Sequence, residues 1–446
     1  MDHKSKALSR RKFLGDAAAI GAIGALGVGA VISSCGRRAE YTAPVFPDQA
    51  PDGRVLRAGV VGCGGRGTGA AINFLNAGPN LEIVALGDVF QHRLDRCRNE
   101  LREKMNVEVP DANCFTGFDA YRHVIDSDID YVILCEPPYF RPGSFEYAVQ
   151  ARKHIFAEKP VGVDPVGIRN FMAAGKMAES AGLYVAAGTQ RRHQRDYVKT
   201  FEQVKNGAIG DLVSANCYWN QSKLWHVNRQ AGWSDMEAML RDWVNWTWLS
   251  GDHIVEQHVH NIDVVNWYFE KHPARAVGFG GRHRRPTGDQ YDFFSVDFVF
   301  DDNRHMHSMC RQIDGCANNV SELIFGTEGY TNGQNRIWDY NGNVTWEYEY
   351  PAGPDGQPGR SVAVSPYDQT HINLVTAIRT GNYLNEAQNV AEACLTAMMG
   401  RESAYTGREV TWEEMMESSQ RRGPASLEMG SVDIAAVPPT PGTAPA

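Results

Sequence analysis

VLRAGVVGCGGRG, residues 55–67, is the stretch that decides the fold of this chain. The β-branched run at its start predicts a buried strand, and the G-x-G-x-x-G pattern after it predicts a tight turn into a helix. Gly62 permits the turn, Gly64 has no side chain to block a pyrophosphate, and Gly67 lets the helix pack closely on the strand. Because the first N–H groups of a helix bind anions, the stretch predicts a dinucleotide-binding unit.

Asp88 strengthens this interpretation because it lies about 20 residues beyond the glycine loop, at the end of the next predicted strand, 81–86. A carboxylate at this place accepts hydrogen bonds from the adenine ribose and repels a 2′-phosphate. The sequence therefore predicts NAD as the cofactor, with NADP less favoured. Arg93 lies nearby and could weaken that preference.

The pattern of predicted elements then gives the fold class, which is α/β. Between residues 54 and 188, short β-branched runs alternate with helical patterns, which predicts a doubly wound parallel Rossmann sheet. Residues 189–423 are predicted to form an α+β domain with a large, open and mostly antiparallel sheet, because several runs alternate apolar and polar residues. The proline-containing end of the chain, 424–446, is expected to be a disordered tail.

Glu158-Lys159-Pro160 directly follows a predicted strand at 155–157. In an open parallel sheet, ligands bind beyond the carboxyl ends of the strands. A lysine there can donate to a substrate hydroxyl and stabilise developing negative charge. Taken alone, however, a solvated surface lysine is the more common situation.

Glu256, His260 and Asp263 have the spacing of one helical face if residues 256–263 form a single helix. A histidine is suited to remove a hydroxyl proton near neutral pH, and a carboxylate can orient its ring. Taken alone, a histidine packed and hydrogen-bonded beneath a helix is more common. Tryptophans crowd the region before this segment, and we expect one or two of them at a sugar-binding site.

The N-terminus has the features of an export signal. Residues 9–14 read SRRKFL, a twin-arginine address, and the weakly apolar stretch 17–32 is short for a membrane-spanning helix. ISSC at 32–35 resembles a lipoprotein cleavage site, so we expect a periplasmic protein lipidated at Cys35 and tethered to the membrane through residues 36–53. Ordinary cleavage near Cys35 and an N-terminal transmembrane anchor are the alternatives.

Charge and residue usage exclude some classes of partner. A formal net charge of −9 argues against a nucleic-acid partner, whose phosphates need a basic face. Cys310 and Cys316 are close in the sequence and could pair, but spacing alone does not decide this. The spacing of the histidines matches no standard zinc pattern, so no metal site is expected among His253, His258, His260, His305 and His307.

Together these motifs resemble the glucose–fructose oxidoreductase, inositol dehydrogenase and rhizopine-catabolism family (Gfo/Idh/MocA), from residue 54 to about residue 415. The resemblance implies that Lys159 is the catalytic lysine, His260 the general base and Glu256 the acid of the helix. The family more often has aspartate at the position of Glu256. It typically has Thr-Pro where this chain reads CEPP, at 135–138.

The resemblance also implies an oxidoreductase that acts with NAD(P) on a carbinol of a sugar, glycoside or polyol, assembled as a dimer or tetramer. An exported enzyme has no evident pool of free NAD, so we expect its nucleotide to stay bound and to be recycled. A glycoside hydrolase or lyase that uses a transient keto-sugar is the main alternative, and a non-catalytic sugar-binding lipoprotein is the second. The expected cofactor-binding residues are Gly62, Gly64, Gly65, Arg66, Gly67, Asp88, Glu136, Pro137, Glu158 and Lys159.

Overall fold

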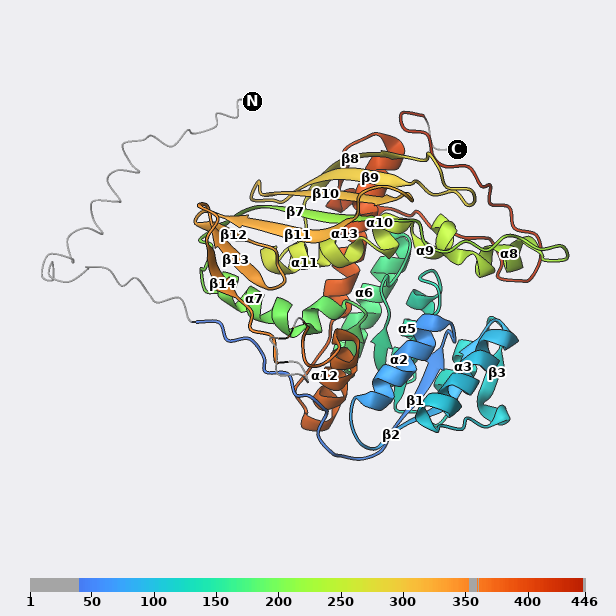
Figure 1. Ribbon diagram of the computed structural model, residues 1–446. Helices are drawn as coiled ribbons and strands as arrows, with labels where there is room; N and C mark the ends of the chain where they lie inside the picture. The colour runs from blue at the N-terminus through green and yellow to red at the C-terminus, as the bar shows by residue number, and fades with distance from the viewer. Residues whose placement is uncertain (1–39, 353–358, 360, 444–446) are drawn as a thin grey trace, which may run out of the picture. The chain divides into compact units, whose positions relative to one another are not determined.

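Six parallel strands form the first sheet, in the order β3-β2-β1-β4-β5-β6 (Figure 1), which confirms the predicted Rossmann arrangement. The computed structural model describes residues 40–352, 359 and 361–443, and the described residues from Ala43 onward form one compact unit. The strands are β1 Leu56–Val61, β2 Leu81–Asp88, β3 Cys114–Thr116, β4 Tyr131–Leu134, β5 His154–Ala157 and β6 Val185–Ala187. The connecting helices are α2 Gly65–Asn76, α3 Gln91–Met105, α4 Ala120–Asp126, α5 Arg141–Gln150 and α6 Pro165–Ser180, with a short 3-10 turn η1 at Asp111–Asn113.

The second sheet has nine strands in the order β14-β13-β12-β11-β7-β10-β9-β8-β15. All the neighbours pair antiparallel except β7 and β10, as predicted for a mostly antiparallel sheet. Its strands are β7 Leu212–Gln221, β8 Arg275–Gly281, β9 Phe293–Val299, β10 His305–Gln312, β11 Asn319–Gly326, β12 Gly329–Thr331, β13 Arg336–Asp339, β14 Val344–Glu347 and β15 Val410–Thr411.

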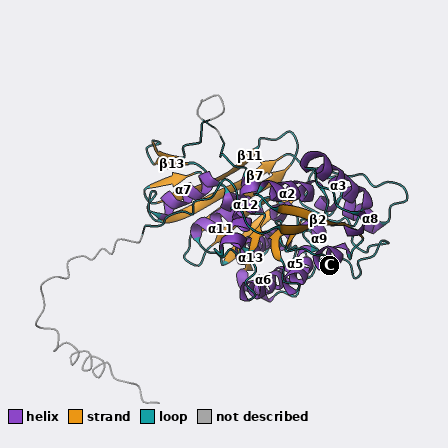
Figure 2. Ribbon diagram, turned by 90° about the horizontal axis from the view of Figure 1, so that it is seen from below, coloured by secondary structure: helices purple, strands orange, loops and turns teal. Residues whose placement is uncertain are grey.

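Helices cover one face of this second sheet, where α11 and α13 pack against its strands (Figures 1 and 2). On the opposite face Phe279 is 67% exposed, and Val277 and Met309 are also exposed. The helices and 3-10 turns of this part are η2 Gln190–His193, α7 Arg195–Lys205, α8 Asp235–Arg241, η3 Trp243–Asn245, α9 Thr247–Ser250, α10 His253–Glu256, α11 Val259–Phe269, α12 Pro366–Thr380, α13 Ala387–Thr406 and α14 Trp412–Glu417.

The core beneath the first sheet includes a helix from far along the chain. Ile372 and Val375 of α12 share one buried cluster with Leu56 and Tyr131 of the parallel strands. The Tyr131 hydroxyl also lies 3.0 Å from Nδ1 of His371. The Rossmann sheet is therefore completed by residues outside the predicted range 54–188.

Parts of the expected membrane tether, 36–53, and of the expected disordered tail, 424–446, pack against the rest of the protein. Ala50 is buried in the core, and its N–H donates to the carbonyl of Ala77 at 2.7 Å. Val432 and Ile434 pack on an apolar cluster near α8, and the Tyr291 hydroxyl donates to the carbonyl of Pro439 at 2.8 Å. The prediction of a disordered tail at 424–446 is wrong as far as residue 443, because these apolar side chains find partners that composition does not reveal.

The export signal and Cys35 lie outside the described residues. Within the described part of the chain, no helix is both long and apolar enough to span a membrane. Every cysteine there has a free thiol, including the buried Cys310 and the exposed Cys316, so the two do not pair.

Candidate active site

The glycine loop joins β1 to α2 as the sequence predicts. Gly62 has φ +88°, a conformation that favours glycine, and a Cβ on Gly67 would collide with the carbonyl oxygen of Gly62. Gly64 is the N-cap of α2, and no side chain caps this helix start. The N–H groups of the first turn are therefore available for an anion such as a pyrophosphate.

Replacing Gly67 with alanine is expected to lower the free energy of unfolding by about 1–3 kcal/mol and to weaken NAD binding, because the new Cβ would push the loop off the helix. Gly69→Ala is the matched control, since a Cβ there would meet only the Arg66 side chain at an ordinary 3.5 Å. Thermal unfolding and NAD titration measure both effects. Equal stability and NAD affinity in the two variants would contradict this role of Gly67.

A cleft of about 1290 Å³ opens over this loop. It exceeds the roughly 300–1,000 Å³ of ordinary small-ligand pockets, as a ligand the size of a dinucleotide requires. Glu158 and Lys159 are not part of its lining, whereas the other expected cofactor residues are: Gly62, Gly64, Gly65, Arg66, Gly67, Asp88, Glu136 and Pro137.

Asp88 lies at the end of β2, where it ties the glycine loop to the sheet. One carboxylate oxygen accepts the N–H of Cys63 at 2.8 Å and the other accepts the N–H of Phe90 at 2.9 Å. Burial raises the pKa of Asp88, while the Phe90 N–H and the charge of Arg93 oppose this shift. The carboxylate therefore fixes the loop as well as facing the cleft.

Glu136 lines the cleft just beyond β4, and its two carboxylate oxygens are buried without a hydrogen-bond partner. Burial raises the pKa of this carboxyl, and the nearby charge of Arg141 acts in the opposite direction. A buried carboxyl whose oxygens make no hydrogen bond is suited to bind a polar atom of a ligand.

Arg66 connects the cleft to the lysine motif. It lines the cleft, and its Nε donates to the Glu158 carboxylate. The other oxygen of Glu158 accepts the N–H of Lys159 at 2.9 Å. The glycine loop and Glu158-Lys159 are therefore held together by a single arginine–carboxylate pair.

Lys159 and Glu256 form an ion pair in which each side chain is only 9% exposed. The Nζ of Lys159 lies 3.1 Å from Oε1 of Glu256 and also donates to the Glu256 backbone carbonyl. The second carboxylate oxygen accepts from the Gln257 amide. Glu256 thus positions Lys159, whereas the sequence led us to expect that it orients His260.

The expectation of a single helix at 256–263 is also wrong, because the helix is interrupted between α10, which ends at Glu256, and α11, which begins at Val259. Asp252 caps the first turn of α10 by accepting from the N–H of His253. The Nε2 of His258 lies 2.7 Å from the Ser308 hydroxyl on β10. This contact fixes the residue between the two helices against the sheet.

His260 lies at the start of α11, buried and stacked on Trp219, with ring centroids 5.7 Å apart. Its Nδ1 has no hydrogen-bond partner. Burial, followed by the charges of Lys159 and Arg191, holds the pKa of His260 well below 6.5. The imidazole is therefore neutral at neutral pH and able to accept a proton.

Sequence reasoning missed several residues around these groups. Arg191 follows β6 and pairs with Glu322, so the strand-end rule that selected Lys159 could have found it. Residues 421–425, which line the cleft, were missed as well. Trp225 and Trp243 also line the cleft, and both belong to the tryptophan-rich region in which one or two site residues were expected. The described residues contain no group of three or more His, Cys, Asp or Glu side chains suited to hold a metal ion.

The fold and the cleft define a two-domain protein with a Rossmann nucleotide site. Residues 56–189 match the model of an oxidoreductase family with an NAD-binding Rossmann fold, GFO_IDH_MocA, and residues 197–331 match the GFO/IDH/MocA C-terminal domain. The chain belongs to the GFO/IDH/MocA family, as its motifs suggested.

Two curated relatives are similar in sequence to this chain. Inositol 2-dehydrogenase of Acidothermus cellulolyticus is 25% identical over 235 residues, 53% of this chain and 60% of its own length. Glycosyl hydrolase family 109 protein 4 of Phocaeicola vulgatus is 26% identical over 321 residues, 68% of this chain and 57% of its own length. The chain thus spans less than two thirds of either relative.

A solved structure of scyllo-inositol dehydrogenase from Lactobacillus casei, with bound NAD(H) and scyllo-inositol, has the same fold, with a TM-score of 0.58 at 19% identity. The match covers 80% of this chain and 99% of that chain.

Proposed function

We propose that this protein oxidises a carbinol of a sugar, glycoside or polyol with NAD held in the cleft. The observation that carries the proposal is that Arg66 and Glu158 connect the glycine loop to Lys159. Lys159 also lies close enough to His260 for its charge to help keep that ring neutral. The family membership and the similarity to inositol dehydrogenases support the same class of reaction.

The residues present fit NAD, which accepts a hydride from the substrate carbon when it is bound. The uncapped start of α2 would hold the pyrophosphate, and Asp88 and Glu136 would bind polar groups along the cleft. His260 takes the hydroxyl proton, since its ring is neutral at neutral pH. Lys159 donates to the same oxygen and stabilises its negative charge, with Glu256 holding the ammonium in place.

We expect NAD to bind at least about tenfold more tightly than NADP, because the Asp88 carboxylate repels a 2′-phosphate. Calorimetric titration of nucleotide-free protein with each cofactor measures the ratio. The Asp88→Asn variant, which lacks the negative charge, should bind NAD and NADP with more similar affinities. Tighter binding of NADP than of NAD to the unchanged protein would contradict the assignment and give Arg93 the controlling role.

The second candidate is a glycoside hydrolase or lyase that oxidises a sugar carbon to a ketone and eliminates a substituent. The hydrolase then adds water to the double bond, and in both cases the bound NADH reduces the ketone again. It is favoured by the relative from Phocaeicola vulgatus, whose match covers more of this chain than that of the inositol dehydrogenase. Incubating the protein with glycosides and with free polyols separates the two. Release of free sugar without net formation of NADH selects the hydrolase, and net NADH selects the dehydrogenase.

If the purified protein neither contains nor binds a nucleotide, the third candidate, a non-catalytic sugar-binding lipoprotein, replaces both enzymes.

The twin-arginine stretch and the ISSC sequence support export to the periplasm with a lipid on Cys35. The open face of the second sheet, with Val277, Phe279 and Met309 exposed, supports assembly as a dimer or tetramer through that face.

A further inference from the structure

The cleft has a second wall that comes from the end of the chain. Arg421, Arg422, Gly423 and Leu427 line the same cavity as the glycine loop. We call residues 421–434 the C-terminal strap. In Figure 1 the end of the chain, in red, runs beside α8.

One end of the strap is fixed by charged contacts. The guanidinium of Arg422 donates to the Glu402 carboxylate at 2.7 Å, and its backbone N–H donates to Asp164 at 2.8 Å. Gly423, with φ +116°, lies so close to Tyr139 that a Cβ would collide with the ring. This end is therefore firmly joined to the first domain and to α13.

The other end is fixed by a smaller, mostly apolar contact. The Met236 N–H donates to the Gly430 carbonyl at 3.0 Å, and the Val432 N–H donates to Asp235 at 3.2 Å. Residues 425–429 between the two ends are exposed. Val432 and Ile434 pack against a cluster made of Phe90, Met236, Met239, Leu240, Trp248 and Leu249.

This cluster lies at the adenosine end of the expected cofactor site, since Phe90 follows Asp88 by two residues and both line the cleft. Arg241 and Trp243 of the second domain also line the cleft there. The guanidinium of Arg241 lies 4.3 Å from the centre of the Phe90 ring. A nucleotide in the cleft would thus lie between the first domain and a wall from the second domain and the strap.

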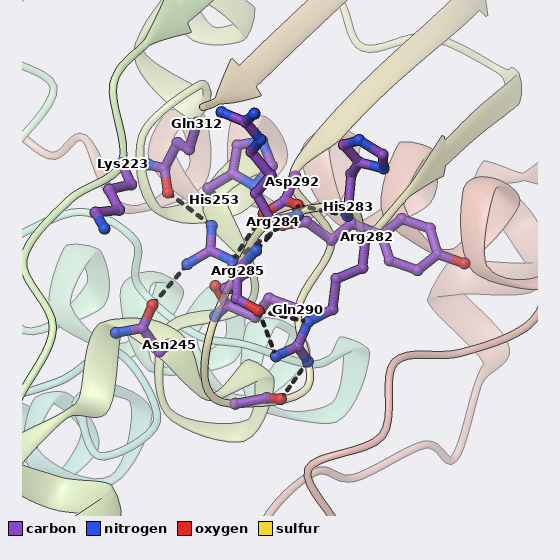
Figure 3. A network of polar contacts seen from close by, with 12 residues as sticks. Lys223, Asn245, His253, Arg282, His283, Arg284, Arg285, Gln290, Asp292 and Gln312 are labelled. Atoms are coloured by element: carbon purple, nitrogen blue, oxygen red, sulfur yellow. Dashed lines mark hydrogen bonds and ion pairs between the residues drawn. The ribbon is translucent and has the colours of Figure 1, made fainter. Parts of the chain in front are cut away.

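A polar network keeps the Trp243 segment in place (Figure 3). Asn245 accepts from Arg285 at 2.6 Å and donates to Asp242 at 2.8 Å. Arg285 also donates to Gln312 on β10 at 2.8 Å. The wall beside Trp243 is therefore anchored to the second sheet.

The far end of the strap is held by the packing of Val432 and Ile434 and by the two hydrogen bonds of Gly430 and Val432. Beyond the strap, the chain is held again where the Pro439 carbonyl accepts from the Tyr291 hydroxyl.

We propose that the C-terminal strap retains the nucleotide, so that the cofactor leaves only when the far end of the strap detaches. The proposal rests on NAD occupying the cleft, and it explains how a nucleotide could stay bound through many turnovers. Retention of this kind lowers the dissociation rate constant, which is the usual route to tight binding.

The test detaches the far end without changing the cleft, with the double variant Val432→Asp/Ile434→Asp. Protein loaded with NADH is mixed with excess NAD, and the loss of NADH fluorescence gives the dissociation rate constant. We expect an increase of about tenfold or more over the unchanged protein. Val437→Asp is the control, because Val437 is 68% exposed and should release NADH at the original rate.

A chain ending at Gly423 is the second variant, which keeps the Arg422 contacts and decides the question if the double variant does not fold. Equal NADH dissociation rate constants in the unchanged protein and in the folded variants would contradict the proposal that the strap retains the nucleotide. The assay needs no turnover. Loss of the proposed reaction with intact NADH retention is therefore distinguishable from loss of retention.

Discussion

Lys159→Ala is expected to reduce kcat by about 10²–10³-fold while NAD remains bound. In the proposed reaction the ammonium donates to an alkoxide and stabilises it, and the loss of one such preorganised donor has an effect of this size. NAD should remain because Arg66 and the glycine loop, which line the cleft, are unchanged in this variant.

The variant also leaves the Glu256 carboxylate without its partner in a buried position, which costs stability. Lys159→Met/Glu256→Gln removes both charges and separates this effect from the loss of turnover. Lys176→Ala on α6, an exposed lysine, is the control. Turnover close to that of the control in either Lys159 variant would exclude the lysine from the chemistry.

His260→Ala is expected to lower kcat by about 10²–10⁴-fold, the usual contribution of a positioned general base. The pH dependence should follow from the lowered pKa of His260. Because the ring must be neutral to accept a proton, activity should stay on its upper plateau as the pH falls to 6.5 and decline only at the lower pKa. Burial and the charges of Lys159 and Arg191 are the causes of that low value.

The measurement is the profile of kcat/KM against pH for the unchanged protein and for His123→Ala, in which an exposed histidine on α4 is removed. Both should share an acid limb below pH 6.5. A midpoint at or above 6.5 would contradict the lowered pKa of His260.

Much of the fold was predictable because local patterns and tertiary structure agree. The predicted strand at 155–157 is part of β5, and the glycine loop opens α2 as the motif requires. Strands β3 and β12 have only three residues each, too short to show a period of their own. They exist because neighbouring strands supply their hydrogen-bond partners.

The sequence indicated several residues of the candidate site but not which of them contact one another. Helical spacing joined Glu256 to His260, yet Lys159, distant in the sequence, is the group that the carboxylate contacts. The break at His258 depends on Ser308, which belongs to another strand. The strap escaped prediction because its composition is that of a tail, while Val432 and Ile434 are partly buried against a cluster that only the tertiary structure assembles.

A crystal structure with bound NAD tests the central claim most directly. We predict that the pyrophosphate lies at the start of α2 and that the nicotinamide ring faces the Nζ of Lys159 and the imidazole of His260. A nicotinamide ring that lies away from both side chains would contradict the enzymatic mechanism, even if the nucleotide occupied the cleft.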